Sequence, residues 1–202
     1  MTAKALADGF HPVPKGKIAT VVTFLERTVA PEGAPFPCPD GFRLERADGI
    51  GTEEFRALFR RIGEDWMWWS RLAMDETALA ALLSDPRRDI QLARRGDEAV
   101  GIVELDFTDP ANVELAFFGL VPGIEGKGIG RWLMDAGLRI AFASPETRRV
   151  FVHTCHFDSP RALPFYMASG FRAYDVQVEV CDDPRLVGLL PESATPQVPV
   201  IC

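Results

Sequence analysis

The sequence contains little cysteine, little histidine and no long apolar run. Its four cysteines, Cys38, Cys155, Cys181 and Cys202, are far apart and lack the paired spacing of a zinc site. We therefore expect reduced thiols, a cytoplasmic location and no bound metal. Residues 1–16 contain no apolar core of a secretory signal, and no stretch is long enough to cross a bilayer. The sequence thus predicts a protein with no membrane partner.

Clusters of positive charge are missing as well. The 22 lysines and arginines are outnumbered by 29 acidic residues and occur as scattered pairs rather than as a stripe. A nucleic-acid partner is therefore disfavoured. With 202 residues, of which 47% are hydrophobic, the chain is long enough to bury a large core in a single domain.

Changes in composition divide this domain into an arm, a core and a tail. We expect residues 1–40 to form an N-terminal arm that contains an extra strand and a linker, because four prolines fall between Val29 and Asp40. The core is expected over residues 41–181. Residues 182–202 are rich in proline and are expected to form an irregular tail.

Hydrophobic periodicity predicts the elements. A β-rich run over Lys17–Glu26 is expected to pair with an edge of the sheet. The expected core order is a strand over Phe42–Arg46, helices between Thr52 and Gly63 and from Glu76 to Leu83, strands over Asp89–Arg94, Glu98–Phe107 and Asn112–Val121, a helix after the glycine turn, a strand over Val150–Cys155, a helix over Ser159–Ala168 and a strand over Phe171–Val180. This order predicts an α+β fold with a mixed, mostly antiparallel sheet and helices on both faces.

The glycine turn within Val113–Phe142 organises the rest of the chain. An apolar strand is broken at Pro122, three glycines follow, and a helical pattern begins after them; the glycines are Gly126, Gly128 and Gly130. A strand, a glycine turn and a helix together place backbone N–H groups at a helix N-terminus, where they bind anions, usually phosphate. Glycine lets the ligand approach these amides and permits a positive φ. The alternative is a structural turn without a ligand.

Two other phosphate-binding motifs do not fit the turn. A Walker loop needs Gly-Lys followed by Ser or Thr, but Lys127 is followed by Gly128. A dinucleotide fingerprint needs a parallel βαβ unit whose second strand ends in an acidic residue. Here three antiparallel-looking strands precede the turn, and the next strand ends in His153, Thr154 and Cys155.

Two motifs carry a resemblance to a known family. EGKGIG at Glu125–Gly130 resembles the acetyl-CoA pyrophosphate loop of the GNAT superfamily of N-acetyltransferases, whose pattern is Gln/Arg-x-x-Gly-x-Gly/Ala. SPRALPFYMASGF at Ser159–Phe171 resembles its second cofactor motif, which Asn opens and Tyr-x-x-x-Gly-Phe closes. The resemblance extends from about Glu98 to Val180. Glu125 replaces the usual Gln or Arg and Ser159 the usual Asn, which changes the contacts to the cofactor rather than the fold.

The resemblance implies that acetyl-CoA is the cosubstrate and that the sheet splays between its fourth and fifth core strands. Pantetheine then lies in the wedge between these strands. Gly119 suggests a bulge or a close backbone approach, and an unpaired amide beside it would hydrogen-bond pantetheine or the thioester oxygen. Lys127 and Arg131 offset charge lost at Glu125. The expected cofactor-binding residues are Leu120, Val121, Glu125, Gly126, Lys127, Gly128, Ile129, Gly130, Arg131 and Ser159.

Acetyl transfer requires a neutral amine, whereas a free alkylammonium has a pKa of about 10. A carboxylate or a water chain must therefore accept a proton. Glu114 stands eleven positions before Glu125, the spacing at which members of the resembled family carry a general base. Glu104 on the neighbouring strand is the alternative base. His153 is a further candidate, with a structural histidine as the other interpretation.

The resemblance also implies that the Tyr166 hydroxyl lies near the coenzyme sulfur and protonates the departing thiolate. The alternative is a tyrosine that only packs its ring. On the acceptor side, Trp66 and Trp69 are candidates to wall the amine, with core packing as the other interpretation.

Taken together, these features predict an acetyl-CoA-dependent N-acetyltransferase that moves an acetyl group to a primary amine of a small molecule by direct attack on the thioester. The protein is expected to be a monomer or a homodimer. Two alternatives remain open: a non-catalytic acyl-CoA-binding or sensor protein, and an acetyltransferase of protein lysines or N-termini.

Overall fold

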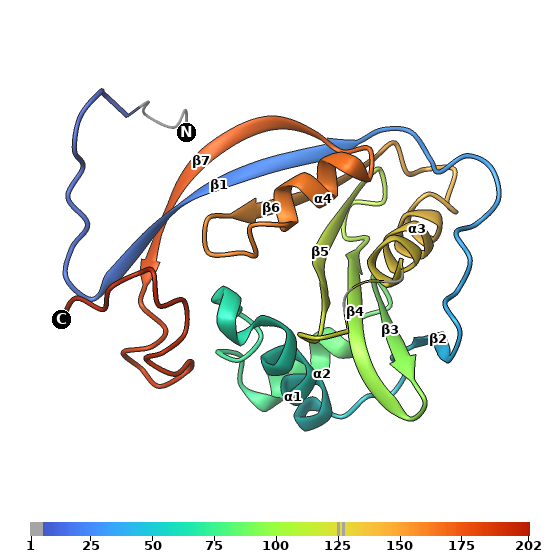
Figure 1. Cartoon of the computed structure of the whole chain (residues 1–202), viewed down its shortest axis with the longest axis horizontal. Coiled ribbons are helices and arrows are strands. Elements are labelled where there is room, and N and C mark those ends of the chain that lie inside the picture. Colours follow the sequence, from blue (N-terminus) through green and yellow to red (C-terminus); the bar gives the residue numbers. More distant parts are fainter. Residues whose placement is uncertain (1–5, 125, 127) are drawn as a thin grey trace.

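The computed structural model describes residues 6–124, 126 and 128–202, and within them seven strands form a single sheet. Figure 1 shows this sheet as a long curved layer with helices on both faces. The strand order is β2-β3-β4-β5-β6-β1-β7. The strands are β1 (Lys17–Arg27), β2 (Phe42–Arg46), β3 (Arg88–Arg95), β4 (Glu98–Asp106), β5 (Asn112–Leu120), β6 (Arg149–Cys155) and β7 (Arg172–Asp182).

Neighbouring strands run antiparallel except for β5 and β6, which run parallel. The prediction of a mixed, mostly antiparallel sheet is therefore confirmed. The position expected for the first strand is wrong, because β1 lies between β6 and β7 rather than at an edge. The physical reason is that Ile18, Val22 and Leu25 on β1 are buried, whereas nearly all of β7 is exposed. The more polar β7 is the strand that can stand at the edge.

The sheet splits between β5 and β6, as predicted. These strands pair only at Asn112 with Arg149, Val113 with Val150 and Glu114 with Phe151. Beyond Glu114, β5 follows β4 through a bulge opposite the Glu104–Leu105 step, and β6 follows β1. The bulge falls at Ala116 rather than at Gly119, because Phe117 pairs with Glu104 and Leu115 with Leu105. The split leaves a wedge between the two halves of the sheet.

Helices cover both faces of the sheet (Figure 1). One face is packed by the helices α1 (Thr52–Gly63) and α2 (Glu76–Leu83) and by the 3₁₀ turn η1 (Glu64–Trp66); the other is packed by α3 (Ile129–Ala141) and α4 (Ala162–Ala168). The period-2 alternation of β4 divides its side chains between two cores: Ile102 packs on the α1 side and Val103 on the α3 side. Both cores are closely packed around the split.

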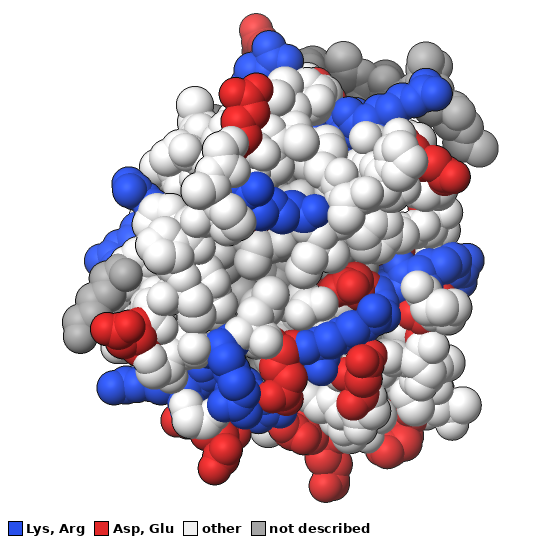
Figure 2. Space-filling view, turned by 90° about the vertical axis from the view of Figure 1, so that its right-hand side faces the viewer, with Lys and Arg blue, Asp and Glu red and all other residues white. Residues whose placement is uncertain are grey.

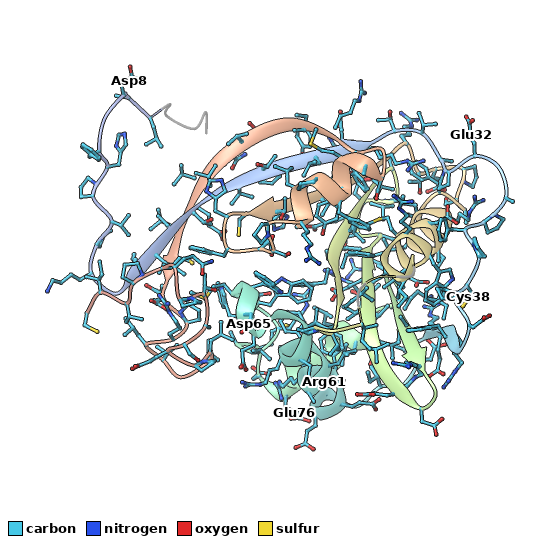
Figure 3. The ribbon with its side chains drawn as sticks, in the orientation of Figure 1. Asp8, Glu32, Cys38, Arg61, Asp65 and Glu76 are labelled. Atoms are coloured by element: carbon cyan, nitrogen blue, oxygen red, sulfur yellow. The ribbon has the colours of Figure 1, made fainter. Side chains whose placement is uncertain are left out.

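The segment between β1 and β2 crosses the molecule beside α3, where Figure 3 places Glu32 and Cys38. Two hydrogen bonds hold it to this helix. The Phe36 N–H donates to Asp135 Oδ2 at 2.9 Å, and Arg139 Nη2 donates to the Gly33 carbonyl at 3.2 Å. The proline-rich linker is therefore fixed in place where it passes the glycine turn.

Residues 183–202 contain no helix or strand, and an ion pair organises them. Arg185 and Asp183 are both buried, with Nη2 to Oδ2 at 2.7 Å, and Arg185 Nη1 also donates to the carbonyls of Ala194 and Val198. Leu190 and Ala194 join the core on the α1 side. Among the described residues, no helix combines the length and apolarity needed to cross a bilayer.

Figure 2 shows the face that lies at the right of Figure 1. Lysine and arginine side chains stand beside aspartate and glutamate on this face, and they form no continuous stripe of one sign. The arrangement agrees with the scattered basic pairs of the sequence.

Candidate active site

Two adjoining cavities occupy the split in the described part of the chain. The larger has a volume of about 780 Å³ and lies beside the end of β5, the start of α3 and α4. The smaller has a volume of about 390 Å³ and lies beside β5, β6, β7 and the residues after α1. They share one wall, which is formed by Trp66, Trp68, Phe118, Asp158 and Tyr166. A molecule in one cavity can therefore meet a molecule in the other at this wall.

The glycine turn opens into the larger cavity. Gly128 precedes α3 in the left-handed conformation (φ 81°), and Gly126 also has a positive φ of 103°. Gly126, Gly128, Ile129, Gly130 and Arg131 all line this cavity, as do Leu120 and Ser159. The turn thus presents the N-terminus of α3 to a ligand, as a phosphate site requires. Glu125 and Lys127, which the sequence analysis assigned to the same loop, lie outside the described residues.

The pairing of β5 with β4 shows which amide near Gly119 points away from β4. The Val121 N–H donates to the Val100 carbonyl at 2.9 Å, so Val121 is not a free donor. Since hydrogen-bonded and non-hydrogen-bonded pairs alternate in an antiparallel ladder, the next pair, Leu120 with Gly101, turns its N–H away from β4. The Leu120 amide is thereby directed toward the split, where β6 has already diverged.

Tyr166 lies in the wall shared by the two cavities. The residue is 7% exposed, and its ring makes edge contacts with those of Phe118 and Phe171. Its hydroxyl has no hydrogen-bond partner among the described residues. Burial, and to a lesser extent the charge of Asp158, raises the pKa of Tyr166 well above its ordinary value. The hydroxyl is therefore held protonated at neutral pH.

Glu114 and His153 meet at the point where β5 and β6 diverge. Glu114 Oε1 lies 3.4 Å from His153 Nδ1, and both residues line the smaller cavity. The hydrogen bond with Glu114 is the main cause of a raised pKa at His153, which burial partly opposes; Asp158 and Glu179 add to the rise. The pair can accept a proton and hold it as a charged imidazolium.

Glu104 is in a different environment from Glu114. Its side chain is completely buried, and Oε1 lies 2.6 Å from Arg71 Nη2 and 3.2 Å from Arg88 Nη1. Arg88 Nη2 contacts Asp106 Oδ2 at 2.7 Å, and Arg71 also stacks over the Phe117 ring. Arg71 and Arg88 line the smaller cavity, whereas Glu104 lies behind them. Glu104 is thus the centre of a buried ion network.

The tryptophan-rich residues 66–69, which follow α1, line the cavities on the α1 side of the sheet. Trp66 lines both cavities and Trp69 the smaller one. Trp68 donates a hydrogen bond from Nε1 to Asp158 Oδ1 at 3.3 Å. A Cβ atom at Gly119 would collide with Ile62 and Trp68, which explains the glycine within this apolar strand.

Several site residues gave no signal in the sequence. Phe36 lines the larger cavity, although it belongs to the proline-rich linker. Asp158 lies in the shared wall and accepts hydrogen bonds from Thr154 Oγ1 (2.6 Å) and the Cys155 N–H (3.0 Å). Arg71 and Glu179 line the smaller cavity. Each reaches the site through tertiary contacts, so no local pattern marks them.

Known proteins share both the sequence pattern and the fold. Residues 52–171 match the sequence profile of the family described as acetyltransferase (GNAT) family. Uncharacterized N-acetyltransferases of Mycobacterium tuberculosis and Mycobacterium bovis are 34% identical to the chain over 99 residues, which are 49% of this chain and 62% of theirs. The chain thus spans less than two thirds of the length of these curated relatives.

Solved structures agree on the fold. A GCN5-related N-acetyltransferase from Sphaerobacter thermophilus has a TM-score of 0.63 at 13% identity, over 86% of this chain and 53% of that one. A GCN5-related N-acetyltransferase from Kribbella flavida has a TM-score of 0.53 at 16% identity, over 85% of this chain and 62% of that one. At these identities the likeness concerns the architecture of the backbone.

Proposed function

The chain belongs to the GNAT acetyltransferase family, and from this premise we propose that it transfers an acetyl group from acetyl-CoA to the primary amine of a small molecule. Acetyl-CoA supplies the activated acetyl group. The observation that carries the proposal is the shared wall, because it places the Tyr166 side chain between a cavity that ends at a glycine turn and a cavity that contains a proton acceptor.

The larger cavity fits coenzyme A by volume and by chemistry. Its volume of about 780 Å³ lies in the range of cofactor sites, and the glycine turn supplies amides for a diphosphate. Arg131 lines the cavity with a positive charge, and the Phe36 ring lies over Gly128. We assign the Leu120 amide to the thioester oxygen, where a fixed donor stabilises the negative charge that develops during transfer.

Proton transfer requires one group that accepts and one that donates. We assign Glu114, paired with His153, as the acceptor for the proton of the incoming ammonium, because both line the acceptor cavity and the pair binds a proton readily. Glu104 remains in its ion network with Arg71 and Arg88. We assign the Tyr166 hydroxyl, which stays protonated, as the donor to the departing thiolate.

Transfer is tested by incubating the protein with acetyl-CoA and a panel of primary amines. We expect thiol release that depends on the amine, together with an acetylated amine detected by mass spectrometry. Because Cys38 and Cys202 are exposed, a reaction without amine gives the thiol background. Binding of coenzyme A without turnover on any amine would favour the non-catalytic sensor, and acetylation of proteins alone would favour the protein-modifying enzyme.

A Glu114→Gln substitution is expected to lower the pKa of His153 toward the ordinary histidine value of about 6.5, because it removes the main cause of the rise. The same pairing determines how the unfolding free energy depends on pH. A raised pKa stabilises the folded protein most below the ordinary value, and this contribution is lost as the pH rises through the raised pKa. The difference in unfolding free energy between wild type and variant should therefore shrink toward high pH.

The measurement is an NMR titration of the imidazole signals, with His153→Gln used to assign His153 among the three histidines. Glu146→Gln is the matched control, since Glu146 is exposed on the loop before β6 and does not line the cavity. An unchanged pKa in the Glu114→Gln variant would show that the pair is not formed in solution.

A further inference from the structure

The smaller cavity contains two arginines whose charge is already matched. Arg71 and Arg88 pair with Glu104, and Arg88 also pairs with Asp106. Two cations are thus balanced by two carboxylates within one network. An acceptor in this cavity meets little net positive charge from these side chains.

Apart from Arg71 and Arg88, the described Asp, Glu, Lys, Arg and His side chains that line this cavity are three carboxylates and one histidine. Glu114 pairs with His153. Asp158 accepts hydrogen bonds from Thr154, Cys155 and Trp68, all of which are uncharged donors. The Glu179 side chain is exposed at the edge of the cavity and makes no hydrogen bond or ion pair with any described residue. Two negative charges therefore remain without a cation in the described structure.

The position of Glu179 separates it from the reacting end of the cavity. Tyr166 and Asp158 lie in the wall shared with the cofactor cavity, whereas Glu179 lines only the smaller cavity. Glu179 stands on β7 opposite Thr20 of β1, and β1 separates it from β6. Both Asp158 and Glu179 act electrostatically on His153, so their fields extend through the space between them.

We propose that the acceptor is a small primary amine that carries a second positive charge, of which an aliphatic diamine is the simplest member, and that Glu179 binds the second charge. The proposal rests on the acetyl transfer inferred above. The reacting amine lies toward Glu114 and Tyr166, and the second ammonium lies toward Glu179. The reacting ammonium then faces Asp158 in the shared wall, and the second ammonium gives Glu179 the positive partner that it lacks in the described structure.

Three amines of equal chain length test this proposal: hexamethylenediamine, hexylamine and aminocaproate. We expect kcat/KM for the diamine to exceed that for hexylamine by about tenfold, beyond the statistical factor of its two equivalent amines, with aminocaproate the poorest acceptor. Higher salt should weaken the preference for the diamine. Calorimetric titration of the same amines into the protein saturated with coenzyme A should give the same order of affinity without requiring turnover.

Variants make the test specific. Glu179→Gln is expected to lower kcat/KM for the diamine by about threefold to fivefold, as for an exposed ion pair, and to leave that for hexylamine nearly unchanged, whereas Glu146→Gln changes neither. Equal use of diamine and monoamine, or aminocaproate as the best acceptor, would overturn the proposal; the latter result would assign recognition to Arg71 and Arg88. If no amine is acetylated but the diamine binds in a Glu179-dependent way, the transfer function fails and the cation site stands.

Discussion

Replacing Gly128 with valine is expected to raise the dissociation constant for coenzyme A by about 100-fold or more. Gly128 lies immediately before α3 with a φ of 81°, a conformation that a β-branched residue adopts only with strain. A Cβ atom at this position would lie 3.0 Å from Cε1 of Phe36, so the ring of Phe36 in the β1–β2 linker leaves no room for the valine side chain. The substitution distorts the turn and moves its amides away from the diphosphate.

Calorimetric titration with coenzyme A measures this effect. Gly96→Val is the matched control, because Gly96 also has a positive φ of 59° but lies in the turn between β3 and β4, where an added Cβ meets nothing within 4 Å. The control includes the backbone strain without the change at the cavity. If Gly128→Val binds coenzyme A as tightly as the control does, the diphosphate is bound by another part of the protein.

Tyr166→Phe is expected to lower kcat by about 100-fold while coenzyme A binds nearly as before. The ring makes the packing contacts with Phe118 and Phe171, and phenylalanine keeps them. What is lost is the hydroxyl, which has no partner among the described residues and lies in the wall between the cavities. The variant thus removes the proposed proton donor at little cost in packing.

The second tyrosine of the chain provides the control. Tyr174 stands on β7, is 45% exposed and lines neither described cavity, so Tyr174→Phe should have normal turnover. The readout is kcat and KM for the best amine, together with the affinity for coenzyme A. Normal turnover in Tyr166→Phe would mean that water or another group protonates the thiolate.

Features that depend on local sequence could be predicted well. The glycine turn and the helix that follows it are encoded by neighbouring residues, because glycine fixes the backbone and apolar spacing fixes the buried face of α3. Tyr166 and the Leu120 amide belong to elements that the pattern predicts, although α4 begins at Ala162 rather than at Ser159. The split between β5 and β6 was predicted from the family resemblance, and it is confirmed because only three residue pairs join these strands.

Features that depend on distant contacts could not be predicted. Phe36 reaches the glycine turn because Asp135 and Arg139 fix the linker, and such pairing has no local signature. Glu104 and Glu114 are alike in sequence context, yet two arginines surround the first and a histidine the second. Charge complementarity of this kind emerges only when helices and strands are assembled.

The interior position of β1 has a consequence for the order in which the protein acquires its structure. An ion pair joins Lys17 to Asp182, residues 165 positions apart; β1 pairs with β7 from Lys17 to Glu26 and with β6 from Val22 to Arg27. During synthesis on the ribosome, β1 is translated before the other six strands of the sheet and cannot pair until β6 and β7 have been translated. Such closure over a long loop is slow. Completion of the acceptor cavity, which Glu179 of β7 lines, is therefore a late folding event.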